Sequence, residues 1–213
     1  MGKASVAVER ESGGAVDDSD SLPTHQRRRR DNIVHAALEL LEEGHEYERI
    51  QMRDVAERAG VALATLYRYF ASKEHLYAAV LLQWSSTFRF RSERSDDRAA
   101  SDEARLRLRL HRVVRAFERH PQFLRAEILL ESSSDAGARE VFQTFADRHQ
   151  HAMAAALRDL DPDDAAAIVE TTSTVMAMRL RSWALGRMSI RDVHASLDRT
   201  VDLIFSTPKP KRR

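Results

Sequence analysis

The chain has 213 residues, of which 43% are hydrophobic, so it is long enough to bury the core of one large domain or two small ones. It contains no cysteine, which excludes a disulfide framework and a thiolate metal site, and no apolar run is long enough to span a bilayer. The formal net charge of +1 at pH 7 identifies no partner, because a basic surface and an acidic remainder can cancel.

The composition favours an all-helical fold. Only 7 glycines and 5 prolines interrupt a sequence rich in Ala, Leu, Glu and Arg, which lose little rotamer freedom in a helix. The N-terminal residues lack the apolar core of a signal peptide. We therefore expect a globular protein of the cytoplasm with no membrane partner.

Residues 1–23 show no periodic apolar pattern. They include Ser12-Gly13-Gly14 and an acidic run at 17–21, and such a composition buries too little surface to offset its ordering entropy. We expect this segment to be a disordered arm.

A helix-turn-helix is expected next. The first helix begins near Thr24, because apolar residues recur at the spacing of one helix face and a glycine follows as a C-terminal cap: Ile33, Ala37, Leu40, Leu41 and Gly44. A second helix fits 52–59 and a third fits 62–70, with a sharp turn at Gly60. Two short helices joined by a turn of this kind are typical of DNA-binding proteins, so we predict a DNA-binding domain over 24–71.

The remaining sequence predicts a larger helical body over 72–206, followed by a basic tail at 207–213. Ser72 is placed to cap a long helix with an apolar stripe at Leu76, Val80, Trp84 and Phe88. A polar break follows at 95–101, and His120-Pro121 ends the next helix because the residue before proline leaves the helical region. Further helices are expected at 122–131, 138–160, 163–186 and 191–205.

Three stretches of the head carry a resemblance to a known family: Met52-Arg53-Asp54-Val55-Ala56-Glu57-Arg58-Ala59-Gly60-Val61, Thr65-Leu66-Tyr67-Arg68-Tyr69-Phe70 and Ser72-Lys73-Glu74-His75-Leu76. Together they resemble the DNA-binding head of TetR family repressors. The resemblance implies a homodimer that binds double-stranded operator DNA and responds to a small apolar effector in its body. One departure is Ala62, which leaves the third helix without the side-chain cap that is common in the family.

The third helix is expected to enter the major groove. Leu66 and Phe70 point inward, which leaves four residues for the groove: Leu63, Ala64, Tyr67 and Arg68. The resemblance implies base-reading roles for Arg53, Leu63, Ala64 and Tyr67, and phosphate contacts for Thr65, Tyr69 and Lys73. Considered alone, a tyrosine on a short helix is more often a packing residue, and Arg53 could pair with Glu57 one turn away.

Basic residues are concentrated at the head. Arg27-Arg28-Arg29-Arg30 is the densest charge run, placed either for phosphate or minor-groove contact or as a solvated face. Between Gln51 and Lys73, four basic residues stand against two acidic ones: Arg53, Arg58, Arg68 and Lys73 against Asp54 and Glu57. This bias is modest, but it falls where DNA contact is expected.

The body carries large apolar residues on several helices. The TetR resemblance implies a ligand cavity there, with these candidate lining residues: Trp84, Phe88, Phe117, Phe123, Phe145, Met153, Met176 and Trp183. Plain core packing is the alternative for any one of them. Helices 163–186 and 191–205 are long enough to pair with their symmetry mates, which would place two recognition helices on a palindromic operator.

A finer resemblance concerns the effector. The head residues at 49–56 and 60–70, together with Arg119-His120-Pro121, resemble the actinobacterial repressors of sterol catabolism known as KstR. That resemblance implies a steroid or fatty acyl coenzyme A type of effector that releases the DNA. The alternatives are a regulator of drug efflux that responds to lipophilic drugs, and a DNA-binding activator without a ligand.

Nothing in the sequence indicates an enzyme, a cofactor or a metal. No G-x-S-x-G, H-E-x-x-H or Gly-rich phosphate loop is present. His149 and His151 are two residues apart and so lie on different helix faces. Glu127 and Glu131 share a face, but such pairs are usually solvated.

Overall fold

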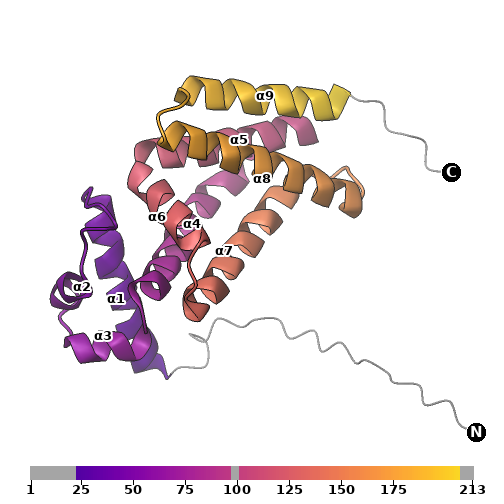
Figure 1. Ribbon diagram of the computed structural model, residues 1–213. Helices are drawn as coiled ribbons and strands as arrows, with labels where there is room; N and C mark the ends of the chain where they lie inside the picture. Colours follow the sequence, from indigo (N-terminus) through magenta and orange to yellow (C-terminus); the bar gives the residue numbers. More distant parts are fainter. Residues whose placement is uncertain (1–22, 97–100, 207–213) are drawn as a thin grey trace, which may run out of the picture.

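The computed structural model describes residues 23–96 and 101–206, with side chains described except at 87–96. Within these residues the fold is all-helical and contains no strand, which confirms the expected fold class (Figure 1). The helices are α1 (Thr24–Glu42), α2 (Met52–Arg58), α3 (Leu63–Tyr69), α4 (Lys73–Asp96), α5 (Asp102–Arg119), α6 (Pro121–Glu131), α7 (Ala136–Ala154), α8 (Pro162–Ala184) and α9 (Ile190–Ser206). Residues 1–22 of the arm expected at 1–23, the basic tail at 207–213 and the side chain of Phe88 lie outside the described residues, whereas Pro23 is the N-cap of α1.

Helices α1, α2 and α3 form a small head at one end of the molecule (Figure 1). Its interior is closed by Ile33, Leu66 and Phe70, which are fully buried. Asn32 adds a polar link, since its Nδ2 atom donates to the carbonyl oxygen of Ala59 at 2.9 Å. Between α2 and α3, Gly60 has φ +64°, a conformation that L side chains rarely adopt, and this glycine makes the sharp turn possible.

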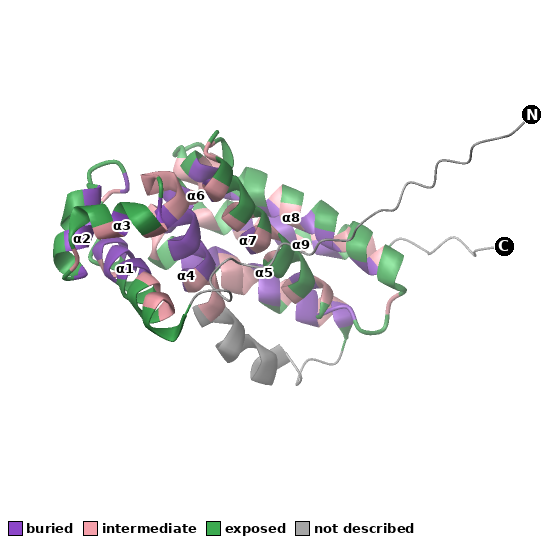
Figure 2. Ribbon diagram, turned by 90° about the horizontal axis from the view of Figure 1, so that it is seen from below, coloured by how far each residue is buried: buried purple, intermediate pink, exposed green. Residues whose placement is uncertain are grey.

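The body packs around α4, which leads away from the head, and α5, α8 and α9 lie together at the opposite end (Figure 1). Figure 2 shows that the buried positions of these helices face one another, while the exposed positions face outward. Of the described helices, none is long and apolar enough to cross a membrane.

Several helix boundaries follow from local chemistry. Ser72 caps α4, as expected, because its Oγ accepts from the backbone N–H of His75 at 2.9 Å. Ser101 caps α5 in the same way, accepting from Ala104 at 3.2 Å. The break at His120 is confirmed, and α6 begins on Pro121 itself because proline is tolerated at the first helical position.

The largest difference from expectation is at the end of α7. The apolar pattern predicted a helix to residue 160, whereas α7 ends at Ala154. A tertiary contact explains the difference: the carboxylate of Asp102 accepts from the backbone N–H groups of Arg158 and Asp159, each at 3.0 Å. Arg105, which pairs with Asp102, also donates from Nε to the carbonyl oxygen of Ala156 at 2.8 Å. The chain after Ala154 is therefore held in a turn.

Candidate nucleic-acid interface and internal cavity

Helix α3 presents one face to the outside and one to the head. Leu66 is fully buried, while Leu63 and Tyr67 keep 39% and 47% of their surface exposed. Ala64 and Arg68 are exposed on the same helix. Large apolar side chains that are exposed close together often mark an interaction site, so this face is suited to contact a partner. Ala62 supplies no side-chain cap, as the sequence indicated.

The residues expected at phosphates sit at the margin of this face. Thr65 and Tyr69 are half-buried, and the guanidinium of Arg68 lies 5.5 Å from the centre of the Tyr69 ring. The Nζ atom of Lys73 lies 4.3 Å from the centre of the Tyr47 ring, and burial lowers the pKa of this amine. Lys73 is thus packed on the head itself, close to the start of α4.

The two arginines of α2 differ in their surroundings. Arg53 is exposed. Arg58 makes a bidentate pair with Glu43, from Nη1 to Oε1 at 2.7 Å and from Nη2 to Oε2 at 2.9 Å. This pairing lowers the pKa of the Glu43 carboxyl. The charge of Arg58 is compensated inside the head, so the local basic bias is smaller than the sequence suggested.

The arginine run falls within the first turns of α1. Arg28 and Arg29 are exposed, whereas the guanidinium of Arg30 lies over the Phe70 ring at 5.1 Å. Part of this run therefore packs against the end of α3 rather than facing solvent.

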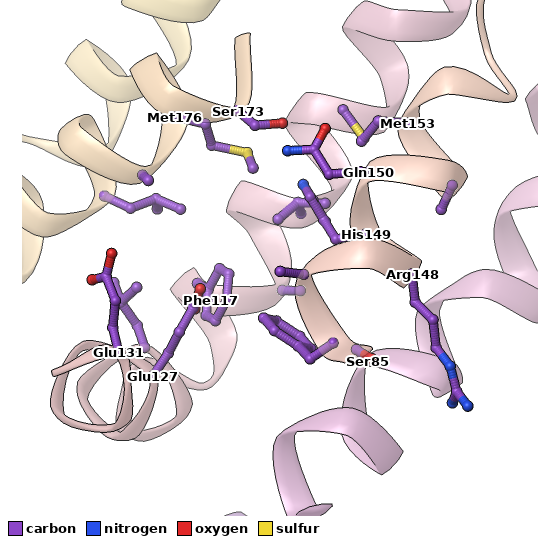
Figure 3. A pocket seen from close by; sticks show the side chains of 18 of the residues that line it. Ser85, Phe117, Glu127, Glu131, Arg148, His149, Gln150, Met153, Ser173 and Met176 are labelled. Carbon is purple, nitrogen blue, oxygen red and sulfur yellow. The ribbon is translucent and has the colours of Figure 1, made fainter. Parts of the chain in front are cut away.

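The body contains a partly open cavity of about 500 Å³, which lies among α4, α5, α6, α7 and α8 (Figure 3). A volume of this size is within the usual range for small-molecule sites. Most of its wall is apolar, with these larger side chains: Trp84, Val113, Phe117, Leu124, Ile128, Phe142, Phe145, Met153, Met176, Met178 and Leu180.

The sequence predicted part of this wall. Of the candidate ligand residues, five line the cavity: Trp84, Phe117, Phe145, Met153 and Met176. Phe123 and Trp183 are not among the lining residues. Phe123 is fully buried and stacks on Trp84 with ring centres 4.2 Å apart, so it packs against a lining residue without lining the cavity itself. Trp183 is half-buried and packs against the core.

Polar groups in the wall were missed by the sequence analysis. Glu127, His149 and Ser173 line the cavity from α6, α7 and α8. The interpretation of Glu127 as a solvated carboxylate is wrong, because its Oε2 atom is buried. Its position among Phe123, Leu124, Ile128 and other apolar residues of α6 was a usable signal, since an acid flanked by apolar residues on a helix is often buried with them.

Comparison with known proteins identifies the family. Residues 33–80 match "Bacterial regulatory proteins, tetR family", and residues 100–204 match "Tetracyclin repressor-like, C-terminal domain". The chain belongs to the TetR family. The first match runs from the middle of α1 to the first turns of α4, and the second covers α5 to α8 and most of α9.

Within the TetR family, the chain is similar to KstR repressors. It is 32% identical to the HTH-type transcriptional repressor KstR of Rhodococcus jostii over 200 residues, which cover 91% of each chain. It is 33% identical to KstR of Mycobacterium tuberculosis over 181 residues, covering 84% of this chain and 82% of that one. These likenesses confirm the resemblance to the KstR-like branch, and such relatives are transcription regulators rather than enzymes.

Solved TetR-family structures share the fold. A TetR regulator from Rhodococcus sp. RHA1 superimposes with a TM-score of 0.70 at 27% identity, covering 85% of this chain and 97% of that one. FadR from Bacillus subtilis in complex with stearoyl-CoA gives a TM-score of 0.60 at 20% identity, with 83% and 97% covered. FadR from Thermus thermophilus in complex with lauroyl-CoA gives 0.67 at 17% identity, with 86% and 98% covered.

In this TetR-family chain, one helix of the cavity wall contacts the head, and another contacts the start of α4. At the start of α6, Gln122 donates to the carbonyl oxygen of Leu41 in α1 at 2.8 Å. At the start of α7, Gly137 packs so closely on His75 that an added Cβ would lie 2.9 Å from its Nδ1 atom. His75 lies in the first turn of α4, so both contacts join the cavity wall to the elements that carry α3.

Proposed function

We propose that the protein is a ligand-responsive repressor that binds a palindromic operator as a homodimer and is released by an apolar small molecule of the steroid or fatty acyl-CoA type. The observation that carries the proposal is the exposed face of α3, where Leu63 and Tyr67 project from a helix that Leu66 anchors in the head. We further propose that Arg53, Ala64 and the other predicted head residues contact the DNA.

A recognition helix needs this combination of an anchored side and an exposed side. Apolar and aromatic residues can contact thymine methyl groups, and an arginine can donate two hydrogen bonds to guanine. Arg53 on α2 and Arg68 on α3 are exposed and supply such donors. The match of residues 33–80 to the TetR family supports the same role.

The cavity supports a ligand-binding role for the body. It is mostly apolar, with few polar groups, which is the usual character of a site for a small organic ligand. The two FadR structures hold acyl-CoA ligands, and at their low identity they show only that this fold has room for such molecules. The likeness to KstR favours a steroid skeleton for this chain.

Exposed apolar residues on the last two helices support a homodimer. Leu185 directly after α8 and Leu203 on α9 keep 57% and 69% of their surface exposed. Burial of such side chains against a second copy is favourable by about 25 cal/mol per Å² of apolar surface. A two-fold axis at this face would present two α3 helices to half-sites about 34–36 Å apart or a multiple of that spacing.

Sequence-selective enrichment of random duplex DNA on the purified protein tests the DNA-binding role. We expect a palindrome to be enriched, and Tyr67→Ala and Arg53→Ala to lose or relax its sequence preference. Arg119→Ala is a matched control, because Arg119 is exposed on α5 far along the chain from α3. Enrichment of no sequence, with binding that depends only on salt, would refute operator recognition.

Thermal-shift measurements test the ligand class, since a ligand that binds only the folded state raises its stability. Coenzyme A thioesters of steroid acids and of fatty acids are compared with cationic lipophilic drugs. A rise in Tm with the thioesters, together with loss of operator binding, is the expected result. A response to cationic drugs alone would favour an efflux regulator, and no response in any class would favour a regulator without a ligand.

A further inference from the structure

We propose that Glu127 recognises a neutral oxygen atom, a carbonyl or a hydroxyl, on the part of the effector that enters the cavity. This inference rests on the proposed function of the body as a ligand site. It adds that the part of the effector inside the cavity carries an oxygen atom and is not a plain hydrocarbon. It also names Glu127 as the residue that distinguishes an oxygenated effector from a hydrocarbon.

The first observation is an unsatisfied polar atom. The Oε2 atom of Glu127 is shielded from solvent and has no hydrogen-bond partner among the described residues. In Figure 3 its side chain extends from α6 into the space between the helices. Buried polar atoms in folded proteins nearly always have a partner, so an unpaired one in a cavity wall is available to form a hydrogen bond with a bound molecule.

The second observation concerns the charges near Glu127, where Arg181 lowers the pKa of this carboxyl group but does not outweigh burial. Glu131 lies one turn further along α6 and forms an ion pair with Arg181 of α8. Burial, reinforced by the nearby charge of Glu131, raises the pKa of Glu127 to about 8. The carboxyl group is therefore protonated at neutral pH, and a protonated carboxyl group donates one O–H hydrogen bond.

The charge of the wall favours an oxygen atom over a cationic group. The lining includes four arginines, at positions 109, 112, 148 and 181, and one ionised glutamate, Glu131, which pairs with Arg181. A ligand cation would meet this positive surplus, whereas an anionic ligand group elsewhere in the site would be attracted by it. A ligand with an acidic portion and a neutral oxygen atom at Glu127 fits both the positive charge of the wall and the unpaired carboxyl group.

A second unpaired atom indicates that more of the wall takes part. The Oγ atom of Ser173 on α8 is also buried without a partner among the described residues. His149 lies on α7, and burial lowers the pKa of its imidazole, so this group is neutral as well. Figure 3 shows Ser173 and His149 in a different part of the wall from Glu127. The cavity therefore offers separate neutral hydrogen-bonding groups on an apolar surface.

The test compares ligand pairs that differ by one oxygen atom. The probes are androst-4-en-3-one with androst-4-ene, and 16-hydroxypalmitoyl-CoA with palmitoyl-CoA. Their affinities are measured by titration calorimetry on the full chain and on Glu127→Gln, which keeps a hydrogen-bond donor, and Glu127→Leu, which removes it. Glu140→Leu is the matched control, since Glu140 is exposed on α7 and outside the cavity wall.

We expect the oxygenated member of at least one pair to bind about 10- to 100-fold more tightly, because its absence leaves the carboxyl group unpaired. Glu127→Gln and Glu140→Leu should keep this ratio, and Glu127→Leu should reduce it to near one. Equal affinities within both pairs for the native chain would overturn the proposal, even if Glu127→Leu did not fold. A quaternary ammonium drug that bound the native chain but not Glu127→Gln would also overturn it, because the carboxylate form would then be the recognised one.

Release of the enriched operator is measured with the same probes. If the oxygen preference and its dependence on Glu127 are found without operator release, the inference holds and the proposed repressor function fails. If the probes release the operator with no preference for oxygen, the repressor function holds and the inference fails.

Discussion

The side-chain amide of Gln122 donates a hydrogen bond of 2.8 Å to the backbone carbonyl oxygen of Leu41. Leu41 lies in the last turn of α1, and Gln122 is the second residue of α6. Two residues further along α6, Leu124 is part of the cavity wall. A displacement of α6 by a ligand would therefore change a contact that holds the head.

Replacing Gln122 by Ala tests this connection. Loss of this partly buried hydrogen bond is expected to lower the free energy of unfolding by about 1 kcal/mol. We also expect operator affinity without ligand to change little, while the ligand concentration for half-release rises. Arg125→Ala is the control, because its contact with Glu46 is exposed and 3.5 Å long. If Gln122→Ala releases half of the operator at the same ligand concentration as the unmodified protein does, this hydrogen bond has no role in release.

The two arginines of α2 should respond differently to removal. Arg53→Ala is expected to weaken operator binding about 10- to 100-fold and leave Tm nearly unchanged. Arg58→Ala is expected to lower Tm, because it leaves Glu43 and Glu39 without their shared partner. Calorimetric Tm values and operator titrations at fixed salt measure both effects. A structural role for Arg58 is contradicted if Arg58→Ala relaxes base preference without a change in Tm.

Asp102 is expected to be a strong determinant of stability. It is buried, pairs with Arg105 and accepts two backbone hydrogen bonds from the chain after α7. Asp102→Asn should reduce the free energy of unfolding in urea by about 3 kcal/mol, because a buried arginine loses its buried carboxylate partner. Asp159 also pairs with Arg105 but is exposed, so Asp159→Asn should cost less than about 1 kcal/mol. Equal effects of the two variants would contradict this account.

Glu127 predicts a pH dependence of stability. Its folded pKa, about 8, lies above the ordinary value of 4.5, so between these pH values the folded state binds a proton that the unfolded state has released. Stability should therefore fall as pH rises from about 4.5 to 8, by at most about 1.4 kcal/mol per unit from this group. Glu127→Gln should remove this slope, and Glu140→Gln should retain it. Urea unfolding across the range measures both, and an unchanged slope in Glu127→Gln would contradict the prediction.

The proposed dimer face gives a prediction on assembly. Leu203 is the most exposed of the large apolar residues on α8 and α9. Leu203→Glu should weaken self-association at least about tenfold, because a charged group would be buried at the interface. Leu129→Glu on α6 is the matched control, since Leu129 is also exposed but lies on a different helix. Sedimentation equilibrium measures the change, and unaltered association of Leu203→Glu would place the interface elsewhere.

Local patterns were sufficient for the helices and the head. The periodicity of Ile33 and Leu41, the turn at Gly60 and the cap at Ser72 depend on residues close together in the chain, and the structure contains each of these features. The family resemblance came from the same local residues around Tyr67. The exposed face of α3 was also predictable, because a helix buries residues at its own spacing.

The sequence by itself thus determined the helical class, the family, the head and the apolar character of the body. Only the tertiary structure decided where α7 ends, which arginine of α2 is compensated, and that Glu127 lies in a cavity wall. Each of these depends on residues far apart in the chain: Asp102 with Arg158, Arg58 with Glu43, and α6 with α7 and α8. Burial and pairing change the charge and the energy of a side chain, and they are set by neighbours that no local pattern specifies.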